Sequence, residues 1–169
     1  MRQLFLMRHA KSSWDNPGLR DFDRPLNKRG RKAAVKMGRF MKDEELVPEI
    51  VCSSPAARTR ETVERWQSAT GYQPELLYVD GLYGAGLGQL FRVIRQTDEV
   101  HRRLMVVGHN PGLHELAIAL TETTGDKNTT LFQKFPTATL AVFDLSLDRW
   151  SDIAPGNGRL RSFIRPKAL

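Results

Sequence analysis

Short apolar runs alternate along this chain with longer segments in which apolar residues recur every three or four positions. A short apolar run bounded by turn residues is typical of a buried strand, and the three-to-four spacing is typical of a helix with one buried face. The runs that predict strands are residues 3–8, 49–54, 75–79, 103–109 and 139–146. The segments that predict helices are residues 28–43, 55–70, 87–94 and 111–120.

The last apolar segment has a different pattern, because residues 158–165 alternate between apolar and polar positions. This alternation is typical of an edge strand. Strands that alternate with helices build a layered sheet whose neighbouring strands run largely parallel. We therefore expect an α/β fold, a three-layer α/β/α sandwich with a mostly parallel central sheet, whose last two strands pair antiparallel. The 169 residues show no repeat and predict a single domain over 1–169.

Capping signals mark two of the predicted helix starts. Ser54 followed by Pro55, and Asn110 followed by Pro111, each combine a capping side chain with a proline at the first helical position. Gly71 is placed to end the first of these helices in a left-handed conformation. Each of these helices therefore should begin directly after a strand.

Two stretches lack a clear period. Residues 11–27 are polar and contain glycine and prolines, which predicts a long ordered loop, and loops of this length in compact domains tend to be functional. An open loop here would admit a bulky protein substrate. Residues 121–137 are also polar, and we expect them to be irregular.

Two of the apolar runs stop at a histidine. His9 follows the first run with Arg8 beside it, His109 follows the run that starts at residue 103, and Arg58 lies in the first turn of the helix after the second strand. Because ligands bind beyond the carboxyl ends of parallel strands, we expect these side chains to meet at one edge of the sheet. Guanidinium forks bind phosphate oxygens, and neutral imidazole is a nucleophile. Nearby arginines should keep such an imidazole neutral, so the sequence predicts an anion site built around two histidines.

Charge and composition narrow the classes of function. Lys and Arg number 26 against 19 Asp and Glu, and the net charge of +7 favours anionic substrates or partners. The basic residues are spread along the chain and form no nucleic-acid motif, so we expect no nucleic acid as a partner. No stretch is long enough to cross a bilayer, and the N-terminal apolar run is too short for a signal peptide, so we expect no membrane partner and a cytoplasmic location. The single cysteine, Cys52, excludes an intramolecular disulfide and a thiolate metal cluster.

Four strings carry a resemblance to a known family, and they are MRHAKSSW, DRPLNKRG, SSPAARTRET and VVGHNPGL. Over residues 1–120 the chain resembles the histidine phosphatase superfamily (phosphoglycerate mutase-like), and more narrowly the short bacterial phosphohistidine phosphatases of the SixA type. The resemblance implies the fold of that superfamily and a phosphoryl group carried by His9. The catalytic residues that it implies are His9, Arg8, Arg58 and His109. The substrate-binding candidates are Arg8, Arg58, His109, Ser12 and Asn110.

Two departures from the family pattern bear on the substrate. The glycine that follows the Arg-His pair in the superfamily is Ala10 here. Larger members also carry a glutamate as general acid, whereas the corresponding segment, GLYGAGLGQL, has no carboxylate. Loss of a general acid typically costs about 10²–10⁴-fold in rate. Because imidazole leaves phosphorus without a strongly placed acid, we expect phosphohistidine to be a better substrate than an alkyl phosphate.

Several alternatives remain at the level of sequence. The chain could be a broad phosphomonoesterase of the same superfamily, or a non-catalytic module that recognises phosphate. Cys52 and Arg58 also have the spacing of cysteine-dependent phosphatases, although this loop has no glycine and Pro55 lacks an N–H. We expect no cofactor and no metal, and a phosphorylated protein or a small phosphorylated compound as substrate. A signalling domain, a metabolic phosphocarrier and a small phosphoramidate all satisfy this description, and the oligomeric state is left open.

Overall fold

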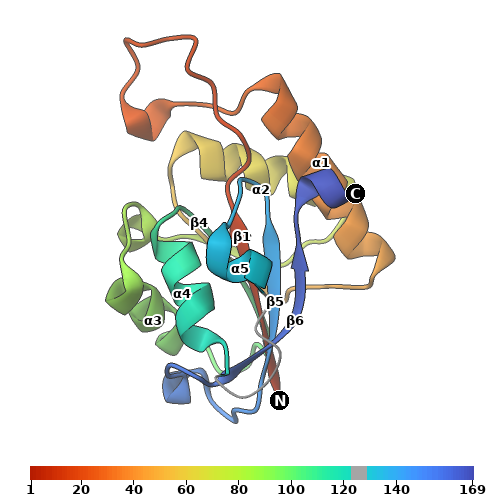
Figure 1. Ribbon diagram of the computed structural model, residues 1–169, viewed down its shortest axis with the longest axis vertical. Coiled ribbons are helices and arrows are strands. Elements are labelled where there is room, and N and C mark those ends of the chain that lie inside the picture. The colour runs from red at the N-terminus through yellow and green to blue at the C-terminus, as the bar shows by residue number, and fades with distance from the viewer. Residues whose placement is uncertain (123–128) are drawn as a thin grey trace.

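The computed structural model describes residues 1–122 and 129–169, and its core is a six-stranded sheet (Figure 1). The strands are β1 Arg2–Arg8, β2 Ile50–Ser53, β3 Glu75–Tyr78, β4 Arg103–Gly108, β5 Leu140–Leu145 and β6 Gly158–Ile164. The helices are α1 Lys28–Asp43, α2 Ala57–Thr70, α3 Leu87–Arg95, α4 Gly112–Leu120 and α5 Thr129–Gln133. Every predicted strand and helix is present, and the observed ends differ from the predicted ones by at most two residues.

The strand order is β3-β2-β4-β1-β5-β6. The first four of these strands run parallel, β5 pairs antiparallel with β1, and β6 pairs antiparallel with β5. The sheet is therefore mixed and mostly parallel, as expected. Since two reversals restore the direction, β6 runs the same way as β1, and its carboxyl end lies at the same edge of the sheet.

Side chains alternate between the two faces of the sheet and form two separate cores. Leu4 and Leu6 of β1 pack with α3 and α4, whereas Phe5 and Met7 pack with α1 and α2. Figure 1 shows the two helix pairs on opposite sides of the sheet. The inner strands β1, β2, β4 and β5 are thus buried on both faces, which explains why they are apolar without alternation in the sequence.

The helix starts correct part of the sequence prediction. Helix α2 begins at Ala57 rather than at Pro55, and its N-cap residue is Ala56. Helix α4 has Pro111 as its N-cap, so the expected capping by Asn110 is wrong. The Ser54 hydroxyl bonds instead to the His109 ring, and the Asn110 side chain bonds to the Phe135 carbonyl. The end of α2 is as predicted, because Gly71 has a φ of 73° there.

The second unpatterned stretch is partly helical. Within residues 121–137 the structure contains α5, so the expectation of an irregular segment is wrong over Thr129–Gln133. Residues 123–128 of that stretch lie outside the described residues. Helix α5 is only five residues long, too short for a periodic pattern to reveal it.

The long loop 11–27 is fixed at both of its ends. Ser12 and Leu26 form an antiparallel bridge, and the Asn27 N–H donates to the Lys11 carbonyl at 3.0 Å. The first turn of α1 also lies directly against the loop, because a Cβ placed on Gly30 would be 2.1 Å from the Lys11 carbonyl oxygen. Only glycine therefore allows this approach of helix and loop.

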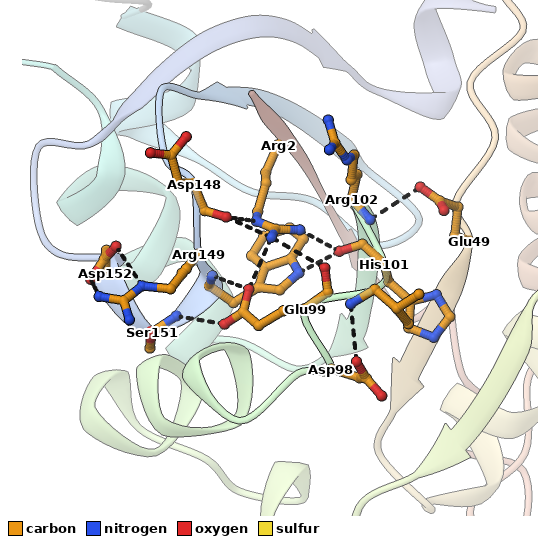
Figure 2. A network of polar contacts seen from close by, with 12 residues as sticks. Arg2, Glu49, Asp98, Glu99, His101, Arg102, Asp148, Arg149, Ser151 and Asp152 are labelled. Carbon is orange, nitrogen blue, oxygen red and sulfur yellow. Dashed lines mark hydrogen bonds and ion pairs between the residues drawn. The ribbon is translucent and has the colours of Figure 1, made fainter.

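A buried arginine anchors the opposite edge of the sheet (Figure 2). The Arg2 guanidinium donates to the carbonyl oxygens of Asp148 and His101, each at 2.6 Å, and forms an ion pair with Glu99 at 3.0 Å. It also lies over the Trp150 ring, 5.3 Å from the centroid. This network ties the N-terminal end of β1 to the loops before β4 and after β5. It lies away from the edge where His9 and His109 leave their strands.

Candidate active site

A pocket of about 380 Å³ opens at the carboxyl ends of β1 and β4, and we call it the edge pocket. All six site residues proposed from the sequence line it. The complete lining is Arg8, His9, Lys11, Ser12, Trp14, Arg24, Arg58, His109, Asn110 and Thr137. The structure therefore brings the six residues together and adds four more to the lining.

The backbone holds His9 between two strands and a helix. The His9 N–H donates to the Gly108 carbonyl at 3.0 Å, which continues the pairing of β1 with β4. The next N–H, that of Ala10, donates to the Thr62 hydroxyl at 3.0 Å, and this hydroxyl donates to the Arg58 carbonyl at 2.7 Å. Thr62 thus connects the two site residues His9 and Arg58 through buried hydrogen bonds.

The hydrogen bond made by the His9 ring fixes which nitrogen is nucleophilic. Nδ1 lies 2.7 Å from the Ala10 carbonyl oxygen, which can only accept. In the neutral ring the hydrogen is therefore on Nδ1, and Nε2 carries the free lone pair. His9 is 6% exposed, so this lone pair is largely shielded from water.

The environment keeps the His9 ring neutral. The pKa of His9 is lowered to about 3, chiefly by burial and to a smaller extent by His109, Arg58 and Arg8, while the hydrogen bond to Ala10 acts in the opposite direction. A pKa this far below 6.5 leaves the imidazole unprotonated at neutral pH. An unprotonated ring is the form that can attack phosphorus.

His109 lies beside His9, with 5.2 Å between the ring centroids. Its Nε2 is 2.7 Å from the Ser54 hydroxyl, which also accepts the Ala56 N–H at 3.3 Å and has its own hydrogen free to donate to the ring. The neutral ring then carries its hydrogen on Nδ1, which is buried and has no partner among the described residues. Burial, followed by the charge of Arg58, lowers the pKa of His109 to about 4. His109 can therefore donate to an anion while it is neutral.

Three guanidinium groups surround the pair of rings. Arg8 and Arg58 were expected, and Arg24 joins them from the long loop. Buried nitrogens without a partner among the described residues are Arg8 Nε, Arg24 Nε, Arg24 Nη1, Arg58 Nε and His109 Nδ1. Buried N–H donors are almost always paired in folded proteins. The four residues that carry these nitrogens all line the edge pocket, and guanidinium and imidazole N–H groups are suited to an oxyanion.

An acidic side chain holds two of the guanidiniums in place. Asp21 accepts from Arg58 and from Arg24, each at 3.0 Å, and from the Tyr83 hydroxyl at 2.6 Å. The hydrogen bond from Tyr83, followed by those from the two arginines, lowers the pKa of Asp21 well below its usual range. Asp21 is therefore ionised, which suits it to orient Arg58 and makes it a poor proton donor.

Arg24 was missed because its position depends on how the loop folds back. It lies under the exposed Trp14 ring, with its guanidinium carbon 3.9 Å from the ring centroid. The loop is closed near this point by the bridge between Ser12 and Leu26. Arg24 stands within the string DRPLNKRG, and this was the one sequence signal that could have marked it. Lys11 and Thr137, which also line the pocket, carried no distinctive signal.

The two substrate-binding candidates differ in their contacts. Ser12 is 8% exposed and lies at the loop bridge. The Asn110 side-chain amide donates to the Phe135 carbonyl at 2.9 Å, and its Oδ1 has no partner among the described residues. Arg8 donates to the same carbonyl at 3.1 Å. The Phe135 carbonyl therefore aligns one guanidinium and one amide at the mouth of the pocket.

No described residue that lines the edge pocket is an aspartate or a glutamate. Among the described residues there is also no group of three or more histidines, cysteines or carboxylates arranged to hold a metal ion. Cys52 lies in the core under α3 and α4, outside the pocket lining, and burial raises its pKa to about 11. Its thiol is therefore protonated at neutral pH and away from Arg58. Over the described part of the chain no helix is long and apolar enough to span a membrane.

Comparison with known proteins gives three matches of interest. A model of the histidine phosphatase superfamily (branch 1) matches residues 4–89. An uncharacterised protein of Mycobacterium tuberculosis is 34% identical over 164 residues, which are 95% of this chain and 100% of that protein. The crystal structure of a protein assigned as phosphohistidine phosphatase SixA of Agrobacterium tumefaciens is 33% identical and has a TM-score of 0.83 over 98% of each chain.

A structure of the protein histidine phosphatase SixA in complex with tungstate is also similar. It has a TM-score of 0.79 over 98% of each chain, at 23% identity. At that level of identity the likeness concerns the fold alone. The expected sheet architecture and the family-like strings therefore agree with independent comparisons of sequence and of structure.

Proposed function

The chain belongs to the histidine phosphatase superfamily, branch 1, and from this premise we propose that it is a phosphohistidine phosphatase that carries the phosphoryl group on His9. The observation on which this depends is the edge pocket itself. A neutral imidazole with a free Nε2 lines a pocket together with four residues, three arginines and His109, that carry five unpartnered buried N–H donors among the described residues. Such a site combines a nucleophile with charge stabilisation for a phosphoryl group.

In the first step the Nε2 lone pair of His9 attacks phosphorus, and the P–N bond to the substrate's imidazole breaks. The leaving imidazole takes a proton from water at its other ring nitrogen, so it departs as a neutral molecule. Arg8, Arg58 and His109 donate hydrogen bonds to the phosphoryl oxygens as their charge is redistributed. The two guanidiniums supply the positive charge that other phosphoryl-transfer sites take from magnesium.

In the second step water attacks the phosphorus on His9, and the new P–N bond breaks to release inorganic phosphate. The water proton passes to the phosphate or to solvent, and the bonding electrons return to Nε2. Nδ1 keeps its hydrogen throughout, because it donates to the Ala10 carbonyl. The phosphorylated ring is therefore cationic, which makes it a good leaving group and the intermediate short-lived.

The absence of a carboxylate from the pocket lining favours P–N substrates over alkyl phosphates. Cleavage of an alkyl ester needs a proton on the departing oxygen. Asp21 bonds to Arg24 and Arg58 of the pocket lining, yet it is held ionised by Tyr83 and these two arginines. We therefore propose phosphohistidine in a protein as the substrate. The alternative activity is that of a broad phosphomonoesterase.

The test compares a phosphohistidine peptide with a sugar phosphate under the same conditions. We expect rapid phosphate release from the peptide and a turnover of the sugar phosphate lower by about 10²-fold or more. His9→Ala should reduce release to background, and rapid quenching of the wild type should trap an acid-labile phosphoryl enzyme that the variant lacks.

Three outcomes would contradict the proposal. Equal turnover of both substrates would favour the phosphomonoesterase. Binding of the peptide without phosphate release would favour a recognition module. Loss of activity both on treatment of the wild type with iodoacetamide and in Cys52→Ser would show that the cysteine takes part in the reaction. With the thiol buried, we expect iodoacetamide to have no effect.

A further inference from the structure

A second and larger cavity adjoins the edge pocket, and we call it the basic recess. Its volume is about 570 Å³, and it shares the walls Arg8, Lys11, Asn110 and Thr137 with the edge pocket. Six of its lining residues are cationic, and they are Arg8, Lys11, Arg29, Lys134, Arg165 and Lys167. No described lining residue is an aspartate or a glutamate.

The cations reach the recess from separate parts of the chain. Arg29 lies in the first turn of α1, Lys134 directly follows α5, and Arg165 and Lys167 follow β6. Figure 1 shows the C-terminal segment beside α1, at the edge of the sheet where β6 ends. The fold therefore gathers like charges that the sequence keeps apart, at an electrostatic cost that an anionic ligand would relieve.

These cations are also unpaired. Within the described parts of the chain, none of Lys11, Arg29, Lys134, Arg165 and Lys167 forms an ion pair with another residue. Some arginines elsewhere in the protein are paired, as Arg31 is with Glu61 at 2.6 Å. A group of free cations around a cavity is the arrangement expected where the partner is a ligand.

The cationic side chains of the recess are more exposed to solvent than Arg58 of the edge pocket. Arg58 in the edge pocket is 6% exposed, whereas Lys11, Arg29, Lys134 and Lys167 are all exposed. Buried guanidiniums with fixed hydrogen bonds suit a desolvated phosphoryl group, and exposed flexible cations suit carboxylates that stay partly hydrated. The recess walls also include apolar atoms of Phe135 and Pro136, against which the stem of a side chain or a peptide backbone can pack.

From these observations we infer that the basic recess binds an acidic segment of the protein substrate, an Asp or Glu side chain that lies close to the phosphohistidine. This inference rests on the proposed function and specifies its substrate class. Arg8 belongs to both cavities, so a phosphoryl group in the edge pocket and a carboxylate in the recess are neighbours on one surface. The substrate would then be recognised by two anionic groups rather than by one.

The experiment uses two chemically phosphorylated histidine peptides that differ only in flanking Glu or Gln residues. With the whole 169-residue chain, we expect kcat/KM to be about tenfold higher for the acidic peptide, since a few exposed ion pairs supply an effect of this size. The preference should shrink as salt is added, because exposed charge pairs are screened. The triple variant R29Q/R165Q/K167Q should bring the ratio of the two kcat/KM values close to one.

The matched control is the triple variant K32Q/R39Q/R102Q, which removes the same charge. These three residues are exposed and line neither cavity. The control should keep the acidic-to-neutral ratio of the wild type, which separates local recognition from the loss of net charge. Thermal melting of both variants near the wild-type temperature confirms that each is folded.

The outcomes separate this inference from the proposed function. Equal kcat/KM for both peptides in the wild type, or the same ratio in both triple variants, would overturn the acidic subsite while leaving phosphohistidine hydrolysis intact. Hydrolysis of neither peptide would overturn the proposed function itself. Recess-dependent hydrolysis of fructose 1,6-bisphosphate, without a preference between the peptides, would assign the recess to the second phosphate of a small bisphosphate and also overturn the inference.

Discussion

Acidification should destabilise this protein through the two histidines of the edge pocket. An unfolded histidine has a pKa of 6.5, whereas in the folded protein burial holds the pKa of His9 at about 3 and that of His109 at about 4. Below pH 6.5 the unfolded state therefore binds protons that the folded state does not bind. The contribution of the two neutral histidines to the unfolding free energy is therefore fully present above pH 6.5. It is lost progressively as the pH falls from there toward the folded pKa values.

The size of the effect follows from the same values. Between pH 7 and pH 5 the linkage relation gives a loss of about 2 kcal/mol in unfolding free energy for His9 and about as much for His109. Together these are a large share of the roughly 5–15 kcal/mol that stabilises a typical domain. His9→Asn should remove one of these losses, so the variant should lose about 2 kcal/mol less than the wild type over this interval.

The assay is urea denaturation at pH 7 and pH 5, in buffers without phosphate or sulfate, because an anion in the pocket would favour protonated rings. His109→Asn should give a similar relief, and the double variant should be the least sensitive to pH. Equal losses in the wild type and in His9→Asn would refute the reasoning, since they would mean that His9 titrates in the folded protein as it does in the unfolded chain.

Four further predictions concern single residues. Asp21→Asn should lower kcat/KM by about tenfold with little change in melting temperature, because it removes the charge that aligns Arg58; unchanged kinetics would deny Asp21 its positioning role. Arg2→Met should lower the unfolding free energy by roughly 2–4 kcal/mol, because carbonyl groups and a carboxylate lose their partner, and activity per folded molecule should stay at the wild-type level. Gly30→Ala should reduce both stability and activity, as measured by melting and phosphate release, because its methyl group would overlap the loop that carries part of the pocket. Modification of Cys52 by iodoacetamide should become measurable only in denaturant, and rapid labelling of the folded protein would contradict its burial.

The sequence predicted the parts of the site that follow directly from strands. His9 and His109 each end a short apolar run, and parallel strands bring such ends to one edge. Arg58 follows from the helix after the second strand in the same way. These positions depend on local pattern and on one rule of topology, so the residues alone were sufficient.

The remaining site residues depend on contacts between distant segments. Arg24 reaches the pocket because the long loop folds back on itself, and Asp21 fixes it there together with Tyr83, which is 62 residues away in sequence. Asn110 was expected to cap α4, but its side chain instead bonds to the Phe135 carbonyl across the edge of the sheet. A capping preference is worth about 1 kcal/mol, and a tertiary partner can easily outweigh it.

The direction of β6 has a practical meaning for anyone who handles this protein. Ile164 at its carboxyl end pairs with Leu140 of β5, which in turn pairs with Met7 of β1. Leu169 lies against α1, where its carbonyl accepts from Lys36 at 3.4 Å. An affinity tag or fluorescent fusion attached after Leu169 would start next to the recess and compete with a bulky substrate. Met1 lies at the far edge of the sheet (Figure 1). Immobilisation and labelling through that end would leave the entrance clear.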